Sequence, residues 1–351
     1  MSELKNLLEL SHYAGNRWDL VQAGGGNTSV KINDIMYIKA SGYLLAELND
    51  DFGVAKVDLE KIKRIPQNNK VLNCNNKKKR EIITTELVNE ATLSKNYKPS
   101  IETLLHSLLD KYVLHTHPVV ANILLVQENW IKQLNALFPD AVFVNYQTPG
   151  IELAIELEKQ LVSKSKDQTK IIFLQNHGVI ISSNSHKKII ETSDFISSTL
   201  EKGLNIDFSY YRYCNVLLNH LKLVCKNNNL VVFYSELISN KFYSVEKFVE
   251  PISPDVFVFC GYEIINIDED LQRINQYFEN FNEYPKIIKY RNHFYIVGNS
   301  IKKAKEQEEL LNFQLYITHF LDNSNLKYNT ISSDEMYYLG NWEAEKFRQK
   351  L

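Results

Sequence analysis

The sequence predicts an α/β protein with about two domains. Short apolar runs typical of strands, such as Tyr112–Leu114 and Ile171–Leu174, alternate with segments whose apolar residues recur at helical spacing. A chain of 351 residues is too long for one small core. Its 44% hydrophobic and 23% charged residues are typical of a soluble globular protein. We expect a first domain at residues 1–215 and a smaller α/β domain at residues 216–351.

The overall charge argues against partners that need a strong field. The chain has 40 Lys and Arg against 42 Asp and Glu, a net charge of −2, so neither nucleic acid nor a membrane surface is an expected partner. No signal-peptide core and no apolar run of membrane-spanning length is present. The four cysteines are scattered without a CxxC pair, which favours reduced thiols and a cytoplasmic location.

The first conspicuous motif is glycine-rich. After a predicted N-terminal helix at residues 2–14, Gly24–Gly26 are followed by Asn27, Thr28 and Ser29. Backbone N–H groups of such a loop can face an anion, and a phosphate would suit it. The alternative is a flexible hairpin turn. No Walker lysine is present and no GxGxxG opens a helix, so a nucleotide-binding fold is not indicated.

A second polar turn follows a predicted strand at residues 34–39. Ser41 and Gly42 could close the anion site, or form a simple loop. Residues 54–65 indicate a strand that passes into a helix. Residues 67–80 are polar and end in a basic run, which we interpret as a solvated loop rather than a binding patch. Residues 84–93 are expected to be helical.

A helix is predicted to begin near Pro99, with Ser100 as the N-cap candidate and an apolar face continuing to Leu109. Glu102 lies in its first turn, where the helix dipole stabilises a carboxylate, and this alone could explain it. His106 lies one turn further on and could share the face of Glu102. We interpret His106 as a packing residue or one that supports a site from behind.

The chemistry concentrates in three histidines. His115 and His117 end the strand that begins at Tyr112. Residues two apart on a strand point the same way, roughly 6–7 Å apart, so both imidazoles can hold one metal ion. His177 ends another apolar run, and Gly178 allows a sharp turn. Three histidines at strand ends predict a catalytic metal site with an open position. Ordinary half-buried histidines are the alternative.

The remaining elements continue the alternation of helices and strands. Helices are expected at residues 119–127, 130–137, 151–163, 185–200, 271–281 and 301–321. Strands are expected at residues 141–146, 170–174, 179–182, 230–234, 256–259, 286–290 and 293–297, with the last two forming a hairpin.

In order, the motifs GGGNTS, SG, PSIE, HTHP and NHG resemble those of the class II aldolase/adducin family of zinc sugar-phosphate aldolases. The likeness covers residues ~10–210. It is nearest to the aldolase part of rhamnulose-1-phosphate aldolases that elsewhere are fused to a short-chain dehydrogenase. The resemblance implies a three-layer αβα domain with a mixed, largely antiparallel central sheet, followed by a smaller α/β domain. It also implies a homo-oligomer, a tetramer in the family.

The resemblance assigns roles to individual residues. The implied zinc ligands are His115, His117 and His177. The implied acid/base is Glu102. The implied phosphate-binding residues are Gly26, Asn27, Thr28, Ser41, Gly42 and Ser100. Some fuculose-phosphate members carry a second serine where this chain has Ile101, so one phosphate donor is missing or supplied elsewhere. Family members often add a tyrosine from a neighbouring subunit, which cannot be placed among 20 tyrosines.

The implied activity is that of an aldehyde-lyase. Zinc would stabilise an enediolate while a ketose 1-phosphate is cleaved to, or formed from, dihydroxyacetone phosphate and an aldehyde. Glu102 would transfer the proton at carbon. Three alternatives stay open: a sugar-phosphate 4-epimerase of the same family, a non-catalytic scaffold resembling adducin, and a zinc-bound sensor or biosynthetic enzyme that acts on activated sugars.

Overall fold

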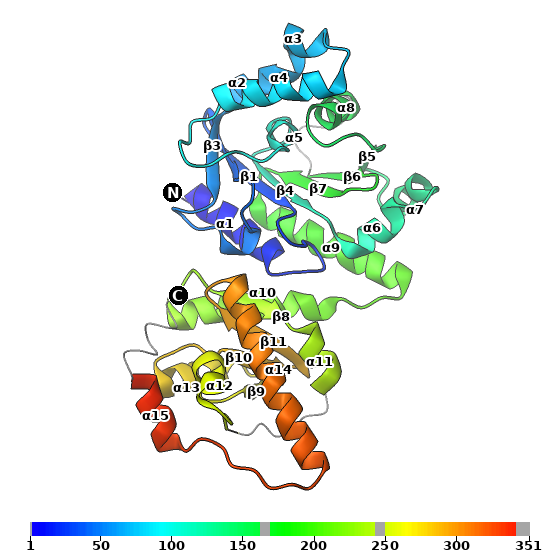
Figure 1. The fold of residues 1–351 in the computed structure, drawn as a ribbon. Helices are drawn as coiled ribbons and strands as arrows, with labels where there is room; N and C mark the ends of the chain where they lie inside the picture. The colour runs from blue at the N-terminus through cyan, green and yellow to red at the C-terminus, as the bar shows by residue number, and fades with distance from the viewer. Residues whose placement is uncertain (1, 162–168, 243–249, 342–351) are drawn as a thin grey trace. The chain divides into compact units, whose positions relative to one another are not determined.

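The computed structural model describes residues 2–161, 169–242 and 250–341. Contacts within the chain divide it into two units, Met1–Ser209 and Tyr210–Leu351 (Figure 1). The domain boundary predicted after residue 215 lies inside a helix, α10 (Ser209–Cys225), and the assignment of two folding domains stays a prediction. None of the described helices is both long and apolar enough to cross a membrane.

Unit 1 is built on a seven-stranded sheet in the spatial order β3-β2-β1-β4-β7-β6-β5. Its strands are β1 (Asn27–Ile32), β2 (Ile35–Lys39), β3 (Val54–Asp58), β4 (Tyr112–Thr116), β5 (Val142–Val144), β6 (Lys170–Leu174) and β7 (Gly178–Ser183). The β5–β6 pair is parallel, and the other neighbouring strands are antiparallel. The predicted mixed, largely antiparallel sheet is confirmed.

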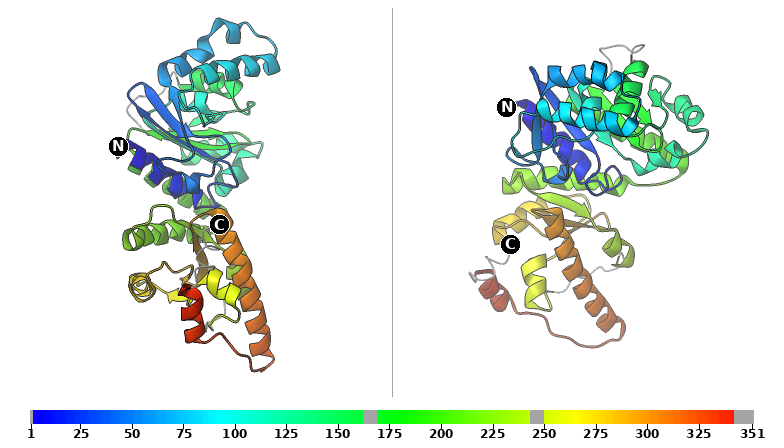
Figure 2. Two further views of the ribbon diagram at one scale, coloured as in Figure 1. Left: turned by 60° about the vertical axis from the view of Figure 1, so that its left-hand side comes forward. Right: turned by 45° about the horizontal axis from the view of Figure 1, so that its top comes forward.

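Helices cover both faces of this sheet (Figures 1 and 2). One face carries α1 (Ser2–Gly15), α6 (Val119–Leu125), α7 (Trp130–Leu137) and α9 (His186–Leu204). The other carries α2 (Leu59–Arg64), α4 (Lys77–Glu90), α5 (Thr103–Ser107) and α8 (Ile151–Leu161). The three-layer αβα architecture is therefore confirmed. Residues 162 and 163, which were expected to end the last of these helices, lie outside the described part of the chain.

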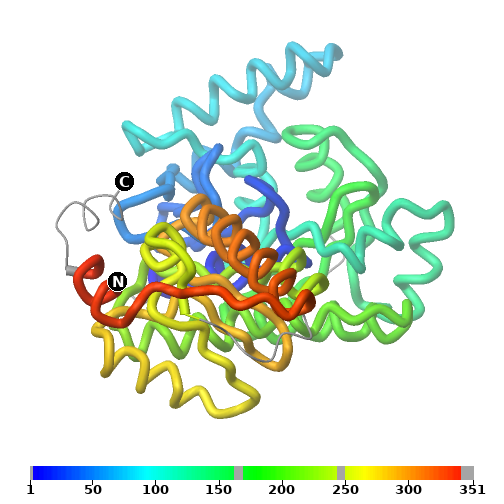
Figure 3. Tube along the Cα trace, turned by 60° about the horizontal axis from the view of Figure 1, so that its bottom comes forward, coloured from blue at the N-terminus to red at the C-terminus, as the bar shows by residue number. Residues whose placement is uncertain are grey.

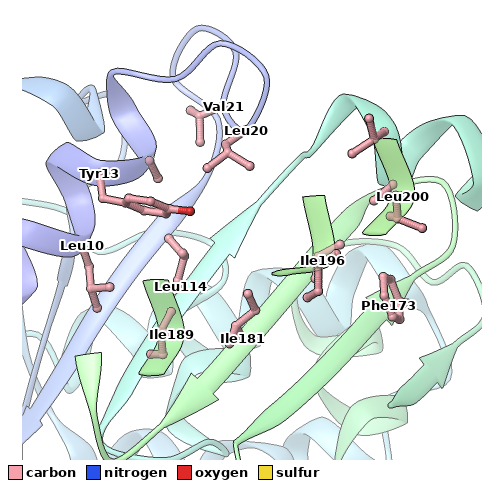
Figure 4. Close-up of a cluster of buried hydrophobic side chains, with 14 of the residues drawn as sticks. Leu10, Tyr13, Leu20, Val21, Leu114, Phe173, Ile181, Ile189, Ile196 and Leu200 are labelled. Carbon is pink, nitrogen blue, oxygen red and sulfur yellow. The ribbon is translucent and has the colours of Figure 1, made fainter. Parts of the chain in front are cut away.

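Alternation along the strands divides the apolar side chains between two cores. On β4, Tyr112 and Leu114 contribute to the core beneath α1 and α9, while Val113 contributes to the core beneath α5 and α8. Figure 4 shows the first core, where Leu114, Ile181 and Phe173 lie close to side chains of α9. Because the two faces differ, the register of each strand also fixes which polar side chains face which helices.

The glycine-rich motif differs from its prediction as a loop in one respect. Asn27, Thr28 and Ser29 belong to strand β1, which pairs with β2 on one side and with β4 on the other. Asn27 lies opposite His115 and Ser29 opposite Val113. Pairing on both edges outweighs the weak strand preference of Asn and Ser, so the strand forms despite its composition.

Three local predictions were wrong. Residues 67–80 do not form a loop: they hold the end of η2 (Ile65–Gln67), α3 (Asn69–Leu72) and the first turn of α4. Asn68 and Asn76 each cap the helix that follows, so their side chains begin structure where composition indicated none. The helix expected from Pro99 begins only at Thr103, and Ser100 does not cap it.

The third error is in unit 2, where residues 256–259 were expected to be a strand. They lie in α12 (Pro254–Cys260), which begins with Ser253 as N-cap and Pro254 in the first turn. The apolar sequence Val-Phe-Val-Phe fits either a buried strand or a buried helix, and the Ser-Pro start signal decides for the helix.

Unit 2 contains a four-stranded sheet in the order β8-β11-β10-β9. The strands are β8 (Val231–Tyr234), β9 (Ile265–Ile267), β10 (Ile287–Tyr290) and β11 (His293–Gly298). The predicted hairpin is β10–β11, and Arg291 and Asn292 in its turn both have positive φ. The other helices are α11 (Glu236–Phe242), α13 (Gln272–Phe281), α14 (Ile301–Asn323) and α15 (Ser333–Asn341). Figure 3 shows α14 beside α12, which it contacts.

All four cysteines are free thiols. Cys214 and Cys260 are buried in unit 2, whereas Cys74 in unit 1 and Cys225 in unit 2 are half-buried. Burial raises the pKa of Cys260 to about 12 and that of Cys225 to about 11.

The core of unit 1 gives a prediction about stability. Phe173 is buried and stacks on Phe143, with 5.8 Å between ring centroids. We expect Phe173→Ala to lower the free energy of unfolding by about 3–5 kcal/mol, because it removes a ring from a packed core. Urea unfolding followed by tryptophan fluorescence, to which Trp130 beside Phe143 contributes, measures this. The control is Phe195→Ala, which removes a ring at the exposed edge of the same cluster. It should lower the free energy of unfolding by about 1 kcal/mol or less. Equal losses would contradict the prediction.

Candidate metal site

Four segments bring polar groups to one edge of the central sheet. Strand β4 ends there with His115 and Thr116, and His117 follows directly. The turn between β6 and β7 contains His177. Strand β1 begins at this edge with Asn27 opposite His115. Because β1 and β2 are antiparallel, the end of β2 at Lys39 lies at the same edge.

The three histidines meet at this edge. One nitrogen from each of His115, His117 and His177 lies within 4.8 Å of the other two. Ring centroids are separated by 5.0 Å for His115 and His117, 4.8 Å for His115 and His177, and 5.3 Å for His117 and His177. His115 is fully buried and the other two are partly exposed. The group is therefore open on one side, as a catalytic metal site requires.

The bonding state of these nitrogens fits a metal ion. Nε2 of His115 and Nε2 of His117 are buried and have no hydrogen-bond partner among the described residues. A buried polar atom left unpaired costs about 1–3 kcal/mol, so two adjacent ones call for a ligand. Burial also lowers the pKa of His117 to about 3, with smaller contributions from His115 and His177. A neutral imidazole can donate its lone pair, and three of them suit zinc or a similar transition metal.

Two glycines make room for the ring of His117. A Cβ on Gly25 would lie 3.0 Å from Nδ1 of His117, and a Cβ on Gly178 would lie 2.9 Å from its Cδ2. The Gly178 Cβ would also lie 2.3 Å from the carbonyl oxygen of Thr116. Gly178 therefore lets β7 approach β4 closely while the ring of His117 passes beside it.

The backbone of His117 is held by the segment before the glycine loop. His117 N–H donates to the carbonyl of Leu20 at 2.8 Å, and the N–H of Val119 donates to that of Asp19 at 2.9 Å. The fully buried Arg17 fixes this segment through a two-point ion pair with Asp19, and it also pairs with Asp194 of α9. A bidentate guanidinium contact of this kind is rigid, so the network restrains where His117 can lie.

Glu102 lies against the histidines. Its Oε2 is 2.6 Å from Nδ1 of His115 and accepts a hydrogen bond from Nδ2 of Asn27 at 2.6 Å, and its Oε1 is 3.2 Å from Nε2 of His177. Burial is the largest influence and raises the pKa of Glu102, but His115 and His177 outweigh it and hold the pKa well below its usual range. The group is thus held as a charged carboxylate beside the histidines.

His106 lies one turn beyond Glu102 and is fully buried. Its Nδ1 is 2.8 Å from Oγ of Ser29 on β1, and its Nε2 has no hydrogen-bond partner in the described part of the chain. Burial lowers the pKa of His106 to about 3, so the ring is neutral at physiological pH. It packs behind Glu102, as the sequence indicated.

Of the residues expected to bind phosphate, some lie together and others have different partners. The turn at Ser41 and Gly42 is next to Ser100, because Ala40 pairs with Pro99 and the N–H of Ser41 donates to the carbonyl of Lys98. The side chains of Asn27 and Thr28 point elsewhere: Asn27 binds Glu102, and the buried Thr28 hydroxyl bonds to Ser11 at 2.7 Å. An anion beside Gly26 would therefore meet the backbone rather than these side chains.

Lys39 is the site residue that sequence reasoning missed. Its Nζ donates to the carbonyls of Gly24 and Tyr43, at 2.9 Å each, and so ties the glycine loop to the turn at Ser41. The residue is 3% exposed, and burial lowers the pKa of Lys39 despite the opposing influence of Glu102. Its position at the end of a strand, two residues before Ser41, was the available signal.

Fold and site together define a class of protein. A three-layer αβα domain carries three histidines and a glutamate at the edge of a largely antiparallel sheet. The sequence model of the Class II Aldolase and Adducin N-terminal domain family matches residues 5–201. The chain belongs to this family, as its motifs predicted. The nearer likeness to rhamnulose-1-phosphate aldolases stays a prediction.

Individual relatives are distant. An uncharacterized oxidoreductase, YuxG of Bacillus subtilis (strain 168), is 24% identical over 218 residues, which is 58% of this chain and 30% of that protein. The N-terminal class II aldolase domain of a conserved protein from Thermoplasma acidophilum is 23% identical, with 57% of this chain and 92% of that chain covered and a TM-score of 0.49. A sugar-phosphate aldolase from Thermotoga maritima is 15% identical, with 58% and 97% covered and a TM-score of 0.40.

The close approach at Gly178 gives a prediction about metal binding. We expect Gly178→Ala to weaken metal affinity about tenfold or more, because the added methyl displaces His117 or separates β4 from β7. Competition with a chelator measures the affinity. Gly203→Ala in α9 is the control, since a Cβ there meets nothing within 4 Å, and it should gain up to about 1 kcal/mol of stability. Unchanged metal affinity in Gly178→Ala would contradict the geometry.

The burial of His106 gives a prediction about pH. The pKa of His106 is lowered from 6.5 to about 3, so the unfolded chain binds more protons between these values. The contribution of neutral, buried His106 to the free energy of unfolding is intact above about pH 6.5 and declines as the pH falls toward 3. At pH 4.5 it is smaller by about 3 kcal/mol. Urea unfolding at pH 7 and pH 4.5 should show that His106→Gln loses less stability on acidification than the wild type. Equal losses in both proteins would refute this.

Proposed function

We propose that this protein is a zinc-dependent aldolase that cleaves or forms a ketose 1-phosphate, with dihydroxyacetone phosphate and an aldehyde as the other side of the reaction. The convergence of His115, His117, His177 and Glu102 in one cluster carries this proposal. Membership of the family supports it. The proposal concerns the part of the chain that the family model matches, because the chain spans less than a third of the curated relative.

The chemistry requires positive charge and a proton carrier at one place. A divalent ion held by the three imidazoles would supply the charge that stabilises an electron pair left on the carbon next to a carbonyl group. Glu102 is the proton carrier in this proposal. In cleavage it takes up the proton that the substrate's hydroxyl group loses as the C–C bond breaks and delivers a proton to that carbon, and in synthesis the same transfers run in reverse. Asn27 keeps the Glu102 carboxylate in place through its hydrogen bond.

The neighbouring loops fit the anionic end of such a substrate. Ser41 and Gly42 lie beside Ser100, and the buried ammonium of Lys39 adds a positive charge between them and the glycine loop. Binding energy gained at a phosphate, away from the reacting bond, can be used to orient that bond. These groups support a phosphorylated substrate. In this proposal Lys39 takes the part of the phosphate donor that Ile101, which has no hydroxyl group, does not provide.

A screen against ketose 1-phosphates tests the proposal. Zinc-loaded protein should release triose phosphate and an aldehyde from at least one of them, and Glu102→Gln should lower kcat by about a hundredfold or more because the proton carrier is lost. Glu128→Gln changes an exposed glutamate and should leave kcat unchanged.

The products separate the alternatives. An epimerised pentose phosphate without triose would indicate the 4-epimerase. Purified protein that binds no metal would favour the adducin-like scaffold. Failure to act on every ketose 1-phosphate, with the metal bound, would refute the aldolase proposal.

A further inference from the structure

The buried histidine behind the site, His106, has one nitrogen that the fold does not use. Nδ1 is occupied by Ser29 at 2.8 Å, whereas Nε2 is buried without a hydrogen-bond partner among the described residues. If His106 served only to fill space, an apolar side chain would do so without the cost of an unpaired polar atom. The arrangement therefore points to a partner for Nε2.

Glu102 is the neighbour that can use this nitrogen. One ring nitrogen of His106, one carboxylate oxygen of Glu102 and one ring nitrogen of His115 all lie within 4.8 Å of one another, and all three residues are buried. The backbone N–H of His106 also donates to the carbonyl of Glu102 at 3.1 Å, which fixes the spacing. A carboxylate has about four acceptor positions, and three neighbouring nitrogens face this one. One position is thus left over.

The tautomer of the His106 ring depends on which group donates in its hydrogen bond with Ser29, and we take the serine as the donor. A serine hydroxyl that donates to Nδ1 leaves the single ring proton of a neutral imidazole on Nε2. A neutral donor also has an advantage over a cationic one beside a proton carrier. A neutral His106 attracts the Glu102 carboxylate less strongly than a cation would. It can therefore hold the Glu102 side chain in place and still allow that side chain to become protonated.

We propose that His106 is a positioning residue for Glu102, which carries its proton on Nε2 and directs it at the carboxylate. The inference rests on the proposed function, in which Glu102 must keep one orientation while it gains and loses a proton. A ring nitrogen of His106 lies within 4.8 Å of a carboxylate oxygen of Glu102, and in this proposal a rotation of the Glu102 side chain or one bridging water connects Nε2 to the carboxylate. His106 itself touches no substrate.

Two substitutions separate the two ring nitrogens. The amide nitrogen of glutamine reaches the place of Nε2, whereas that of asparagine reaches only the place of Nδ1. We expect His106→Gln to keep kcat within about threefold and His106→Asn to lower kcat about 10–100-fold, with KM changed less than about threefold in both. Zinc affinity should stay within about threefold of the wild type, because the metal ligands are unchanged. His319→Gln, an exposed histidine in α14, controls for the substitution itself.

The opposite order of activity, with asparagine tolerated and glutamine not, would overturn the proposal in favour of the Ser29 contact. Equal losses in both variants, or a parallel loss of zinc affinity, would overturn it in favour of a purely structural role. No loss in either variant would overturn it as well.

A second measurement needs no substrate. In protein labelled with ¹⁵N-histidine, the His106 signals are assigned by their absence from His106→Gln. We expect the ring proton of His106 to be bound to Nε2. We also expect the ¹⁵N signal of this nitrogen to shift in Glu102→Gln. A proton on Nδ1, or a signal indifferent to Glu102, would overturn the proposal. If the wild type cleaves no ketose 1-phosphate, the proposed function fails while this spectrum still decides the role of His106.

Discussion

The antiparallel pairing of β4 with a strand on each side is the constraint on which the site depends. Asn27 of β1 lies opposite His115, and Val179 of β7 lies opposite Thr116. A slip of one residue in either ladder would turn His115 away from Glu102, which directly precedes α5. The apolar cores on the two faces oppose that slip, because it would move Val113 into the core that Tyr112 and Leu114 now fill and move those larger side chains into its place. Packing energy thus fixes the geometry of the polar cluster.

This cluster gathers groups that each lose hydration on burial. The pKa values of His106 and His117 fall, the pKa of Lys39 falls, and the Glu102 carboxylate stays charged because two histidines face it. Burying these groups costs hydration free energy, and several contacts hold the surrounding loops in place. Arg17 restrains one loop, Lys39 restrains another, and close backbone contacts restrain the turn at Gly178. The result is a cluster of largely buried, restrained groups, and charges interact more strongly in such surroundings than in water.

How far the sequence predicts this site depends on how far apart along the chain the contacting residues lie. His115 and His117 could be placed together because strand alternation is local and exact to one residue. The approach of His177 is long-range and was expected from its place at the end of a second apolar run, whereas that of Glu102 was expected only from the resemblance to a family. Lys39 was missed because nothing near it in the sequence indicates its contacts with Gly24 and Tyr43. Ser29 was noted only as part of the glycine-rich motif, and its contact with His106 was not expected. In unit 2 the start signal at Ser253 and Pro254 was present, but the apolar run after it fitted a strand equally well.

The distribution of thiols has a practical consequence. Each unit has one half-buried cysteine, Cys74 in unit 1 and Cys225 in unit 2, while Cys214 and Cys260 are buried. The raised pKa of Cys225 leaves little thiolate and slows its alkylation at neutral pH. A first fluorophore can therefore be attached at Cys74 and a second at Cys225 under more alkaline conditions. Energy transfer between the two dyes would then report motion of the units without any engineered attachment point.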